Sequence, residues 1–354
     1  MAEPRRAART QQRVTQKDVA ERAGVAAAVV SYVLNDSPRP VSAEARARVL
    51  AAMSELGYRP NEHARRLMLD HWSESATPRQ FGIIIGESHE MLNRPFYTAL
   101  IVGLLNEAMR LKYTLRFLHL YDSLQNPILF NEQIHPEEVA GVIVMHYQVA
   151  IERHREMLDR VIEQVGNVVC LDFQYPGLSS ILLDQREAGR IATQHLIGLG
   201  HCRIAYVGNQ DNRFEGYLDR LRQNDIPFDP ALAVADRSAN SPADGVAAVA
   251  DLLALPEPPT AVFCVADEVA LGVLSESHRR GMRVPNDLSV IGVDDIGFAK
   301  YTIPQLTTVA VSKQGMASLA MRTLVDRVEH PDTDPVNMVF PVRLVEREST
   351  AAPR

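Results

Sequence analysis

The chain has 354 residues, 46% of them hydrophobic, which is enough for more than one compact domain. No apolar run approaches the roughly 20 residues of a membrane span, and the start MAEPRRAARTQQR lacks the apolar stretch of a secretory signal, so we expect a cytoplasmic protein. Three cysteines lie far apart in apolar, strand-like contexts. This predicts small buried side chains rather than disulfides or a metal site at Cys170, Cys202 and Cys264.

Charge is divided unevenly along the chain. Residues 1–66 carry 12 Lys/Arg against 7 Asp/Glu, whereas the remainder carries 25 against 37, so a head of +5 precedes a body of −12. A basic head on an acidic body favours an anionic partner that contacts the head alone, because the same polyanion repels the body. A basic tail that is merely solvated gives the same totals, so charge alone leaves both interpretations open.

The first elements have the pattern of a helix-turn-helix. Thr15 is placed as the N-cap of a first helix, with Asp18 as its capping-box partner, and Gly24 supplies a tight turn after it. A third helix begins at Ser42 and ends at Gly57. Between them, apolar residues at helical spacing give a second helix an inward face at Val25, Val30, Val33 and Leu34. Three short helices with a glycine turn between the first two are typical of this DNA-binding motif.

The outer face of the second helix is small and uncharged. A helix in the major groove needs small residues there, because its backbone must approach the bases while methyl groups contact thymine and hydroxyls reach bases or phosphates. We therefore predict contacts by Ala27, Ala28, Val29, Ser31 and Tyr32. Phosphate contacts, which set position without reading sequence, are expected from Lys17, Asn35, Arg39, Ser42 and the N-terminal arginines. Thr15 is a further candidate DNA-binding residue. The alanines are equally explained as good helix formers on a solvated face.

From residue 81 onward, apolar β-branched strands alternate with helices. The expected strands are 81–86, 114–120, 141–145, 168–172, 180–184, 203–208, 231–236, 261–266 and 288–295. The expected helices lie near 93–112, 185–199 and 269–280. This alternation predicts parallel sheets covered on both faces. About 270 residues of it is too much for one sheet, so two doubly wound α/β lobes are expected.

Several ordered stretches carry a more specific signal. In the head they are VTQKDVAERAGV, SYVLN and VSAEARARVLAAMSELGYRPNEHARRL. In the body they are SSILLDQREAGRIATQHLIGLGHCRIAYVG, PTAVFCVADEVALGVL, RVPNDLSVIGVDDIGFAKYTIPQLTTV and the terminal LVEREST. Together they resemble the LacI/GalR family of bacterial transcriptional regulators over nearly the whole chain. The resemblance implies an N-terminal all-α helix-turn-helix head plus hinge helix, and an α/β two-lobed periplasmic-binding-protein-like core with doubly wound parallel sheets.

The resemblance also implies a division of the chain into domains. The expected parts are a basic tail at 1–13, a helix-turn-helix domain at 14–59, a hinge helix and linker at 60–79, an effector-binding and dimerisation core at 80–349, and a tail at 350–354. Within the core, lobe 1 is expected at about 80–172 and 301–332, and lobe 2 at about 173–300 and 333–349. The chain therefore crosses between the lobes near residues 173, 300 and 333.

A hinge helix that enters the minor groove is implied after the third helix. Asn61 is a suitable cap after Pro60, Ala64 lies one turn further on, and Leu67 matches the family's intercalating leucine. An apolar wedge between base steps costs roughly a few kcal/mol of unstacking and kinks the duplex. Without the resemblance, Leu67 is better explained as an ordinary residue of an amphipathic helix.

Two positions in the head depart from the family pattern. Ala26 stands where many members have a serine or threonine cap, which forfeits about 1 kcal/mol of helix stability. Tyr32 stands where many members have arginine. Because arginine usually recognises guanine, we expect an operator that differs from the commonest family operators at that base pair.

An effector site is expected between the lobes, because ligands of such sheets bind beyond the carboxyl ends of the strands. Resemblance and strand-end position together give the candidate residues Phe96, Tyr97, Arg213, Arg237, Asp267 and Asp294. Aromatic faces beside an arginine and aspartates suit a small polar ligand with hydroxyls, such as a sugar. Ala266 and Val293 replace residues frequent in the family, so a sugar, a nucleobase and no effector at all stay open.

These features predict a sequence-specific DNA-binding regulator, most simply a homodimeric repressor of a pseudo-palindromic operator whose affinity is modulated by a small-molecule effector, a sugar or related metabolite. An effector-independent repressor or an activator of the same family fits the residues as well. A solute-binding protein shares the lobes but has no DNA-reading head. Because GxGxxG, P-loop, HExxH and GxSxG motifs are absent from the sequence, we expect no enzyme, no cofactor, no metal and no membrane partner.

Overall fold

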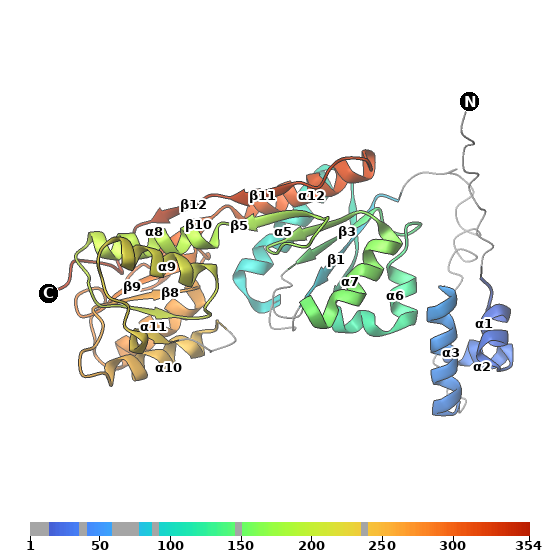
Figure 1. Cartoon of the computed structure of the whole chain (residues 1–354), viewed down its shortest axis with the longest axis horizontal. Helices are drawn as coiled ribbons and strands as arrows, with labels where there is room; N and C mark the ends of the chain where they lie inside the picture. The colour runs from blue at the N-terminus through green and yellow to red at the C-terminus, as the bar shows by residue number, and fades with distance from the viewer. Residues whose placement is uncertain (1–13, 35–40, 59–77, 87–91, 146–150, 235–239) are drawn as a thin grey trace. The chain divides into compact units, whose positions relative to one another are not determined.

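The structure is a computed structural model that describes residues 14–34, 41–58, 78–86, 92–145, 151–234 and 240–354 (Figure 1). Three short helices come first, and two six-stranded sheets with their helices follow. Within the described part of the chain, no helix is both long and apolar enough to cross a bilayer.

The three helices of the head are α1 (Gln16–Ala23), α2 (Ala27–Leu34) and α3 (Ala43–Leu56). Their expected ends are confirmed. The Thr15 side chain accepts a hydrogen bond from the Asp18 amide while the Asp18 carboxylate accepts from the Thr15 amide, which is a complete capping box. Gly24 and Gly57 end α1 and α3 in the left-handed conformation that glycine adopts without steric cost.

A small hydrophobic core holds these helices together. Val30 and Val33 of α2 are buried against Val19 of α1 and against Val49 and Met53 of α3. The predicted inward face of α2 is thus confirmed at its centre, whereas the flanking Val25 and Leu34 are only partly buried. On the opposite face of α2, Ala27 and Ala28 are exposed.

The first sheet contains the strands β1 (Gln80–Ile85), β2 (Thr114–Leu120), β3 (Gly141–Met145), β4 (Val168–Leu171), β5 (Ser179–Leu183) and β11 (Asn337–Phe340). Their order is β11-β5-β4-β3-β1-β2. The pairs of β1 with β2, of β1 with β3 and of β11 with β5 are parallel. Nearly all of the β1, β3 and β4 side chains are buried, as parallel strands covered on both faces require.

The second sheet contains the strands β6 (Ile204–Val207), β7 (Ala233–Val234), β8 (Ala261–Cys264), β9 (Ser289–Asp294), β10 (Thr307–Val311) and β12 (Val342–Val345). Their order is β12-β10-β9-β8-β6-β7. All the registered pairs are parallel except β10 with β12, which is antiparallel. The predicted α/β class with mostly parallel sheets is therefore confirmed, with one antiparallel edge strand added.

The helices of the body are α5 (Pro95–Arg110), α6 (Pro127–Gln133), α7 (Ile151–Val165), α8 (Gln185–Gly198), α9 (Asn212–Gln223), α10 (Pro242–Leu253), α11 (Asp267–Arg279) and α12 (Lys313–Glu329). In the lobe built on the second sheet, α8 and α9 lie on one face of the strands and α10 and α11 on the other (Figure 1). A single hydrophobic core spans these layers. This is the doubly wound arrangement that the alternation of strands and helices predicts.

Sheet membership differs from the expected lobe boundaries at three places. Residues 333–349 were expected in lobe 2, but β11 at Asn337–Phe340 pairs with β5 in the first sheet. The second lobe was expected to begin near residue 173, but β5 at Ser179–Leu183 still belongs to the first sheet. Residues 301–332 were expected in lobe 1, but β10 at Thr307–Val311 pairs with β9 in the second sheet. Apolar β-branched strands of the two sheets have the same composition, so hydropathy cannot assign them to one sheet. Sheet membership follows from backbone pairing alone.

Two glycines let α8 and α9 pack closely. A Cβ atom at Gly189 would lie 2.1 Å from the Arg213 carbonyl oxygen, and one at Gly216 would lie 2.1 Å from the Arg186 carbonyl oxygen. Neither position tolerates a side chain unless the helices move apart. This packing fixes the start of α9, where Arg213 lies.

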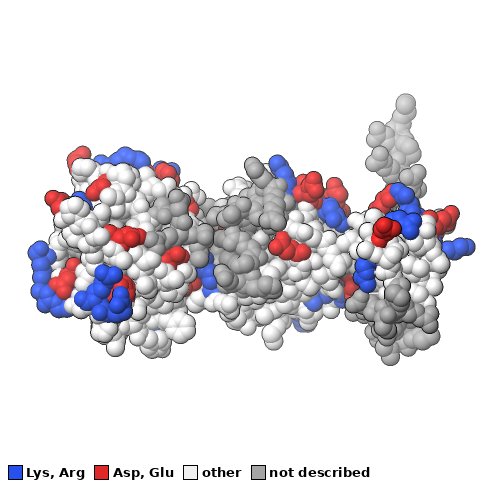
Figure 2. All heavy atoms as spheres, turned by 90° about the horizontal axis from the view of Figure 1, so that it is seen from below, with Lys and Arg blue, Asp and Glu red and all other residues white. Residues whose placement is uncertain are grey.

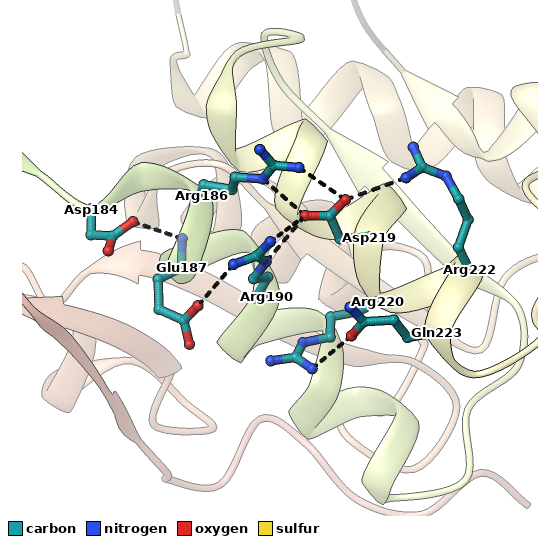
Figure 3. A network of polar contacts seen from close by, with 8 residues as sticks. All are labelled: Asp184, Arg186, Glu187, Arg190, Asp219, Arg220, Arg222 and Gln223. Atoms are coloured by element: carbon teal, nitrogen blue, oxygen red, sulfur yellow. Dashed lines mark hydrogen bonds and ion pairs between the residues drawn. The ribbon is translucent and has the colours of Figure 1, made fainter.

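A cluster of charges covers the same helix pair (Figure 3). The Asp219 carboxylate of α9 accepts hydrogen bonds from Arg186 Nε at 2.9 Å and from Arg190 Nη2 at 2.8 Å, both on α8. Arg222 of α9 adds a third contact at 3.3 Å. The hydrogen bonds from Arg186 and Arg190 lower the pKa of Asp219 to about 2, so the carboxylate is charged throughout the physiological range.

The C-terminal residues are part of the second lobe. His201 Nδ1 lies 2.8 Å from the Thr260 hydroxyl, and His201 Nε2 lies 2.8 Å from the Ala351 carbonyl oxygen. Thr350 Oγ1 lies 2.9 Å from His195 Nε2, so residues 350 and 351, expected as a tail, are bound to the lobe. The prediction of three buried cysteines is wrong at Cys202, which is exposed, because it lies in the turn between α8 and β6 rather than in a strand.

Candidate DNA-binding head and effector site

The head presents most of its predicted DNA-binding residues to solvent. Lys17, Ala27, Ala28 and Ser42 are exposed, as is Thr15, whereas Val29, Ser31 and Tyr32 are half-buried. Five further candidates, Asn35, Arg39, Asn61, Ala64 and Leu67, lie outside the described residues. Small, accessible alanines on the outer face of α2 agree with a helix that approaches DNA closely.

Two of these side chains, those of Thr15 and Ser42, also cap helices of the head. The Thr15 hydroxyl donates a 2.7 Å hydrogen bond to Asp18 Oδ2, so its proton is already used within the capping box. The Ser42 hydroxyl accepts from the Ala45 amide at 3.2 Å, which leaves its proton available to a phosphate oxygen. Of the two capping residues, Ser42 is therefore the better placed phosphate donor.

Charge within the described part of the head is balanced. This part contains four cations, Lys17, Arg22, Arg46 and Arg48, and four carboxylates, Asp18, Glu21, Glu44 and Glu55. Blue and red side chains lie side by side on these helices (Figure 2). Arg22 and Glu55 form an exposed ion pair of 2.5 Å, which contributes little to stability. The excess of +5 in residues 1–66 therefore comes from segments outside the described residues, namely 1–13, 35–40 and 59–66.

The candidate effector residues lie in one compact unit of the chain, formed by residues 89–107, 170–323 and 334–354. Phe96 and Tyr97 start α5, and their rings meet edge to face with centroids 5.1 Å apart. Both are at least 96% buried. The Tyr97 hydroxyl donates to Asp172 Oδ2 at 3.4 Å, and burial together with that carboxylate raises the pKa of Tyr97 well above its usual value.

Arg213 is held in place by Asp211. The guanidinium makes contacts of 2.5–3.2 Å with both Asp211 oxygens, and its Nη1 donates to the Val265 carbonyl oxygen at 2.7 Å. Burial opposes the charged form, but Asp211 outweighs it and raises the pKa of Arg213. Because a guanidinium has five N–H groups, Arg213 keeps donors for a ligand while its orientation is fixed.

Asp267 is fully buried at the start of α11. Thr308 Oγ1 donates to its Oδ1 at 2.6 Å, and the Ile296 amide donates to its Oδ2 at 2.8 Å. Burial and the nearby Asp294 raise the pKa of Asp267 well above its usual value. Asp267 therefore positions the loop after β9, a role that the sequence did not suggest for this candidate ligand residue.

That loop carries Asp294 at the carboxyl end of β9. Asp294 and Asp295 have φ angles of 109° and 51°, a region that residues other than glycine rarely adopt. Lys313 Nζ donates to both of their carbonyl oxygens, and Arg347 Nη2 pairs with Asp295 at 2.6 Å. The terminal LVEREST motif thus contributes to the site through Arg347.

The Asp294 carboxyl group has a raised pKa. Burial and the neighbouring Glu268 raise the pKa of Asp294 to about 7, against the attraction of Arg213, Arg94 and Lys313. Its side chain is 3% exposed. Perturbed carboxylates beside fixed cations are typical of binding sites.

The sequence did not single out several charged residues of this site. They are Arg94, Asp172, Asp211, Glu268 and Lys313. Asp172 follows a predicted strand and Glu268 follows Asp267, so strand-end position could have indicated both. Arg94 lies 174 residues from Glu268 in the sequence, and no local signal connects them. Arg237, the remaining candidate, lies outside the described residues.

The head and the body of the chain each match a known family of sequences. Residues 15–61 match the family described as "Bacterial regulatory proteins, lacI family", and residues 193–350 match the "Periplasmic binding protein-like domain". The transcriptional regulator GalR of Salmonella typhimurium is 32% identical over 352 residues, covering 96% of each chain. The chain belongs to the lacI family of bacterial regulatory proteins. It is therefore a DNA-binding transcriptional regulator rather than an enzyme.

Two solved structures of this family resemble the whole lacI-family chain. A complex of the transcriptional regulator CelR with cellobiose is 28% identical, with a TM-score of 0.67 over 95% of this chain and 100% of that chain. The lac repressor dimer bound to operator and the anti-inducer ONPF is 25% identical, with a TM-score of 0.66 over 96% of this chain and 100% of that chain.

Proposed function

We propose that the chain is a homodimeric repressor of a pseudo-palindromic operator. Binding of a small polar effector raises or lowers its affinity for that operator. The observation that carries the proposal is the joint presence of a helix-turn-helix with an accessible, small-residue α2 and a buried, charged site formed at the starts of α5 and α11 and the end of β9. The lac repressor dimer bound to operator and the CelR–cellobiose complex support this combination.

The DNA contacts divide into two classes. Ala27, Ala28, Ser31 and Tyr32 of α2 meet the bases, while Lys17 and Ser42, with basic side chains of the flanking segments, meet the phosphates. Because the described head is neutral overall, most of the electrostatic affinity must come from those flanking segments. Leu67 is the proposed wedge in the minor groove.

The effector acts by binding one state of the dimer more tightly than the other. A 100-fold preference shifts the equilibrium by about 2.8 kcal/mol per site. Arg213, Asp294 and Tyr97 are the proposed ligand contacts, with Phe96 as an apolar wall and Asp267 as the support of the Asp294 loop. An effector-independent repressor or an activator remains the second candidate.

Selection of bound duplexes from a random pool by the full-length protein tests the proposal at physiological ionic strength. We expect enrichment of a two-fold symmetric sequence, and neutral saccharides added to the selected complex should change its affinity at least tenfold. Equal binding of all duplexes contradicts the regulatory function. Enrichment of a symmetric site without any effect of added small molecules supports the effector-independent alternative.

A further inference from the structure

Residues 346–351, which we call the C-terminal strap, lie against the strands β9 and β10 of the second lobe. Ser349 is fully buried there, and its hydroxyl oxygen accepts a hydrogen bond from the Thr307 amide at 2.8 Å. The guanidinium of Arg347 reaches from the strap to the loop after β9, where its Nη2 lies 2.6 Å from Asp295 Oδ1. The strap therefore holds the loop of the candidate effector site.

A chain of hydrogen bonds connects the strap to a histidine of α8. The Arg347 amide donates to Thr307 Oγ1 at 3.0 Å, and Thr307 Oγ1 lies 3.2 Å from Thr350 Oγ1. Thr350 Oγ1 in turn lies 2.9 Å from His195 Nε2. Thr307 is fully buried, and among the described residues Thr350 Oγ1 is the acceptor within hydrogen-bond distance of its hydroxyl. The Thr350 hydroxyl then donates to His195 Nε2, which must carry no proton.

Protonation of His195 reverses this chain. A protonated Nε2 donates a hydrogen bond, so the Thr350 hydroxyl must turn its own proton toward Thr307. Thr307 Oγ1 then accepts hydrogen bonds from both Thr350 and the Arg347 amide, and its own buried proton is left without an acceptor among the described residues. Leaving a buried donor unsatisfied is costly, so a charged His195 weakens the hold on the strap.

A second histidine holds the end of the strap. His201 is 1% exposed, and its Nε2 lies 2.8 Å from the Ala351 carbonyl oxygen while its Nδ1 lies 2.8 Å from Thr260 Oγ1. Because a carbonyl oxygen only accepts, Nε2 carries the proton and Nδ1 accepts from the Thr260 hydroxyl. A second proton on Nδ1 breaks that bond and leaves a buried charge under the strap.

The surroundings of both histidines favour their neutral forms. Burial lowers the pKa of His195, and Glu346 opposes this shift. Burial also lowers the pKa of His201, as does the nearby His195, whereas the bond to Ala351 raises it. Other ionisable side chains of these segments have partners of their own, namely Arg190 with Asp219, Arg203 with Asp229, Arg347 with Asp295, Glu348 with the Gln305 amide and Cys202 with the Gly200 carbonyl oxygen.

The sign of the pH dependence follows from these directions. When the strap is released, its histidines take up protons near the ordinary histidine pKa of 6.5, whereas the bound strap keeps them neutral to lower pH. The strap is therefore held fully above pH 6.5 and loses stability as pH falls below it.

We propose that the C-terminal strap is a pH-sensitive latch, which neutral His195 and His201 hold on the lobe and which their protonation loosens together with the loop at Asp295. Arg347 transmits the effect, because its amide ends the hydrogen-bond chain and its side chain holds that loop. The inference goes beyond the proposed function, since it adds control by pH and depends on no particular effector or operator.

Asp294 titrates in the same range with the opposite sign. Its pKa of about 7 means that its protonation stabilises the folded state as pH falls, whereas the latch loses stability. Loosening of the loop on acidification is therefore not expected from Asp294.

Hydrogen–deuterium exchange of the full-length protein tests the latch. Peptides covering residues 289–296 and 346–354 are followed at pH 7.5 and 5.5, with correction for the pH dependence of exchange in free amides. We expect their protection factors to fall about fivefold or more at pH 5.5. The buried strand β8 at Ala261–Cys264 is the internal reference and should keep its protection.

Two variants separate the latch from a general effect of acid. His195→Gln keeps a neutral acceptor for Thr350 at every pH, so its loss of protection should be at most half that of the unmodified protein. Thr350→Val breaks the hydrogen-bond chain, so protection of the strap should already be lower at pH 7.5 and should change less on acidification. His278→Gln is the matched control, because His278 is exposed on α11, and it should behave as the unmodified protein.

Equal protection of the unmodified protein at both pH values overturns the inference, and so does an equal loss in His195→Gln and the unmodified protein. If His195→Gln does not fold, the profile of the unmodified protein and that of Thr350→Val decide. Operator selection at pH 7.5 is a separate measurement, so failure of the regulatory function is distinguishable from absence of the latch.

Discussion

The Thr308 hydroxyl donates a 2.6 Å hydrogen bond to Asp267, and this bond ties β10 to the start of α11. The second Asp267 oxygen accepts from the Ile296 amide in the loop that follows Asp294. One buried carboxylate thus joins three segments that are distant in the sequence. Its geometry makes the position of Asp294 dependent on Asp267.

We expect Asp267→Ala to destabilise the protein by about 1–3 kcal/mol, because it leaves the buried Ile296 amide and Thr308 hydroxyl without their acceptor. The stability of Asp267→Asn should lie between those of the unmodified protein and Asp267→Ala, since the asparagine amide oxygen replaces only one of the two accepting oxygens. Urea unfolding followed by circular dichroism measures the difference. Equal stability of all three proteins would show that Asp267 does not support the loop.

Asp294→Asn should change stability in a pH-dependent way. The pKa of Asp294 is about 7 in the folded protein against 3.8 for an ordinary aspartate, so the folded state keeps a proton that the unfolded state releases. Stability of the unmodified protein therefore falls as pH rises from about 4 to 7, and the loss is complete above pH 7.

The asparagine variant has no such loss. Its advantage over the unmodified protein should be near zero at pH 4 and largest at pH 8. It should reach at most about 4 kcal/mol, because each pKa unit corresponds to about 1.4 kcal/mol. The attraction of the Asp294 carboxylate to Arg213 and Lys313 is already contained in its pKa of about 7. Denaturant titrations at pH 5, 6.5 and 8 check the trend, and a constant difference across these pH values would contradict a raised pKa.

Gly216→Ala should weaken the contact between α8 and α9. The added methyl group meets the Arg186 carbonyl oxygen at 2.1 Å, so the helices must separate at a cost of about 1–3 kcal/mol. Gly198→Ala is the matched control within α8, because beyond its chain neighbours and the backbone of its own helix no atom lies within 4 Å of its added methyl group. That control should be neutral or stabilising by up to about 1 kcal/mol. Thermal unfolding compares the two variants, and similar behaviour would argue against close packing at Gly216.

Tyr32→Ala should relax sequence preference at one symmetric base-pair position of the operator. Tyr32 is half-buried on α2 and is a proposed base contact, and loss of one base contact costs roughly 1–3 kcal/mol at that position. Binding to a set of single-base operator variants measures the profile. A uniform loss at every position would mean that Tyr32 contacts phosphate only.

Arg213→Ala should abolish the response to effector without changing operator affinity in its absence. Arg213 lies in the proposed effector site, and its removal also leaves Asp211 without its cation. Arg213→Lys keeps the charge but cannot hold both Asp211 oxygens with a planar group, so we expect a partial response. Fluorescence anisotropy of labelled operator with and without the sugar measures it. A retained response in Arg213→Ala would remove Arg213 from the site.

The sequence alone determined the features that depend on neighbouring residues. The capping box of Thr15 and Asp18, the glycine that ends α1 and the buried strands of both sheets all follow from spacing within a few residues. The ordered motifs along the whole chain also indicated the family to which it belongs. Such features are local because capping, turn geometry and hydrophobic periodicity act over a few turns or strand residues.

Only the tertiary structure decided what each charged residue of the site does. Asp267 was a candidate ligand residue, yet Thr308 and Ile296, 41 and 29 residues away, occupy both of its oxygens. The pairing of Arg94 with Glu268 joins positions 174 residues apart. Backbone pairing likewise placed β10 in the second sheet. Ion pairs between distant residues and strand pairing depend on which segments of the chain fold against each other. The local sequence does not show which distant segments will be close in space.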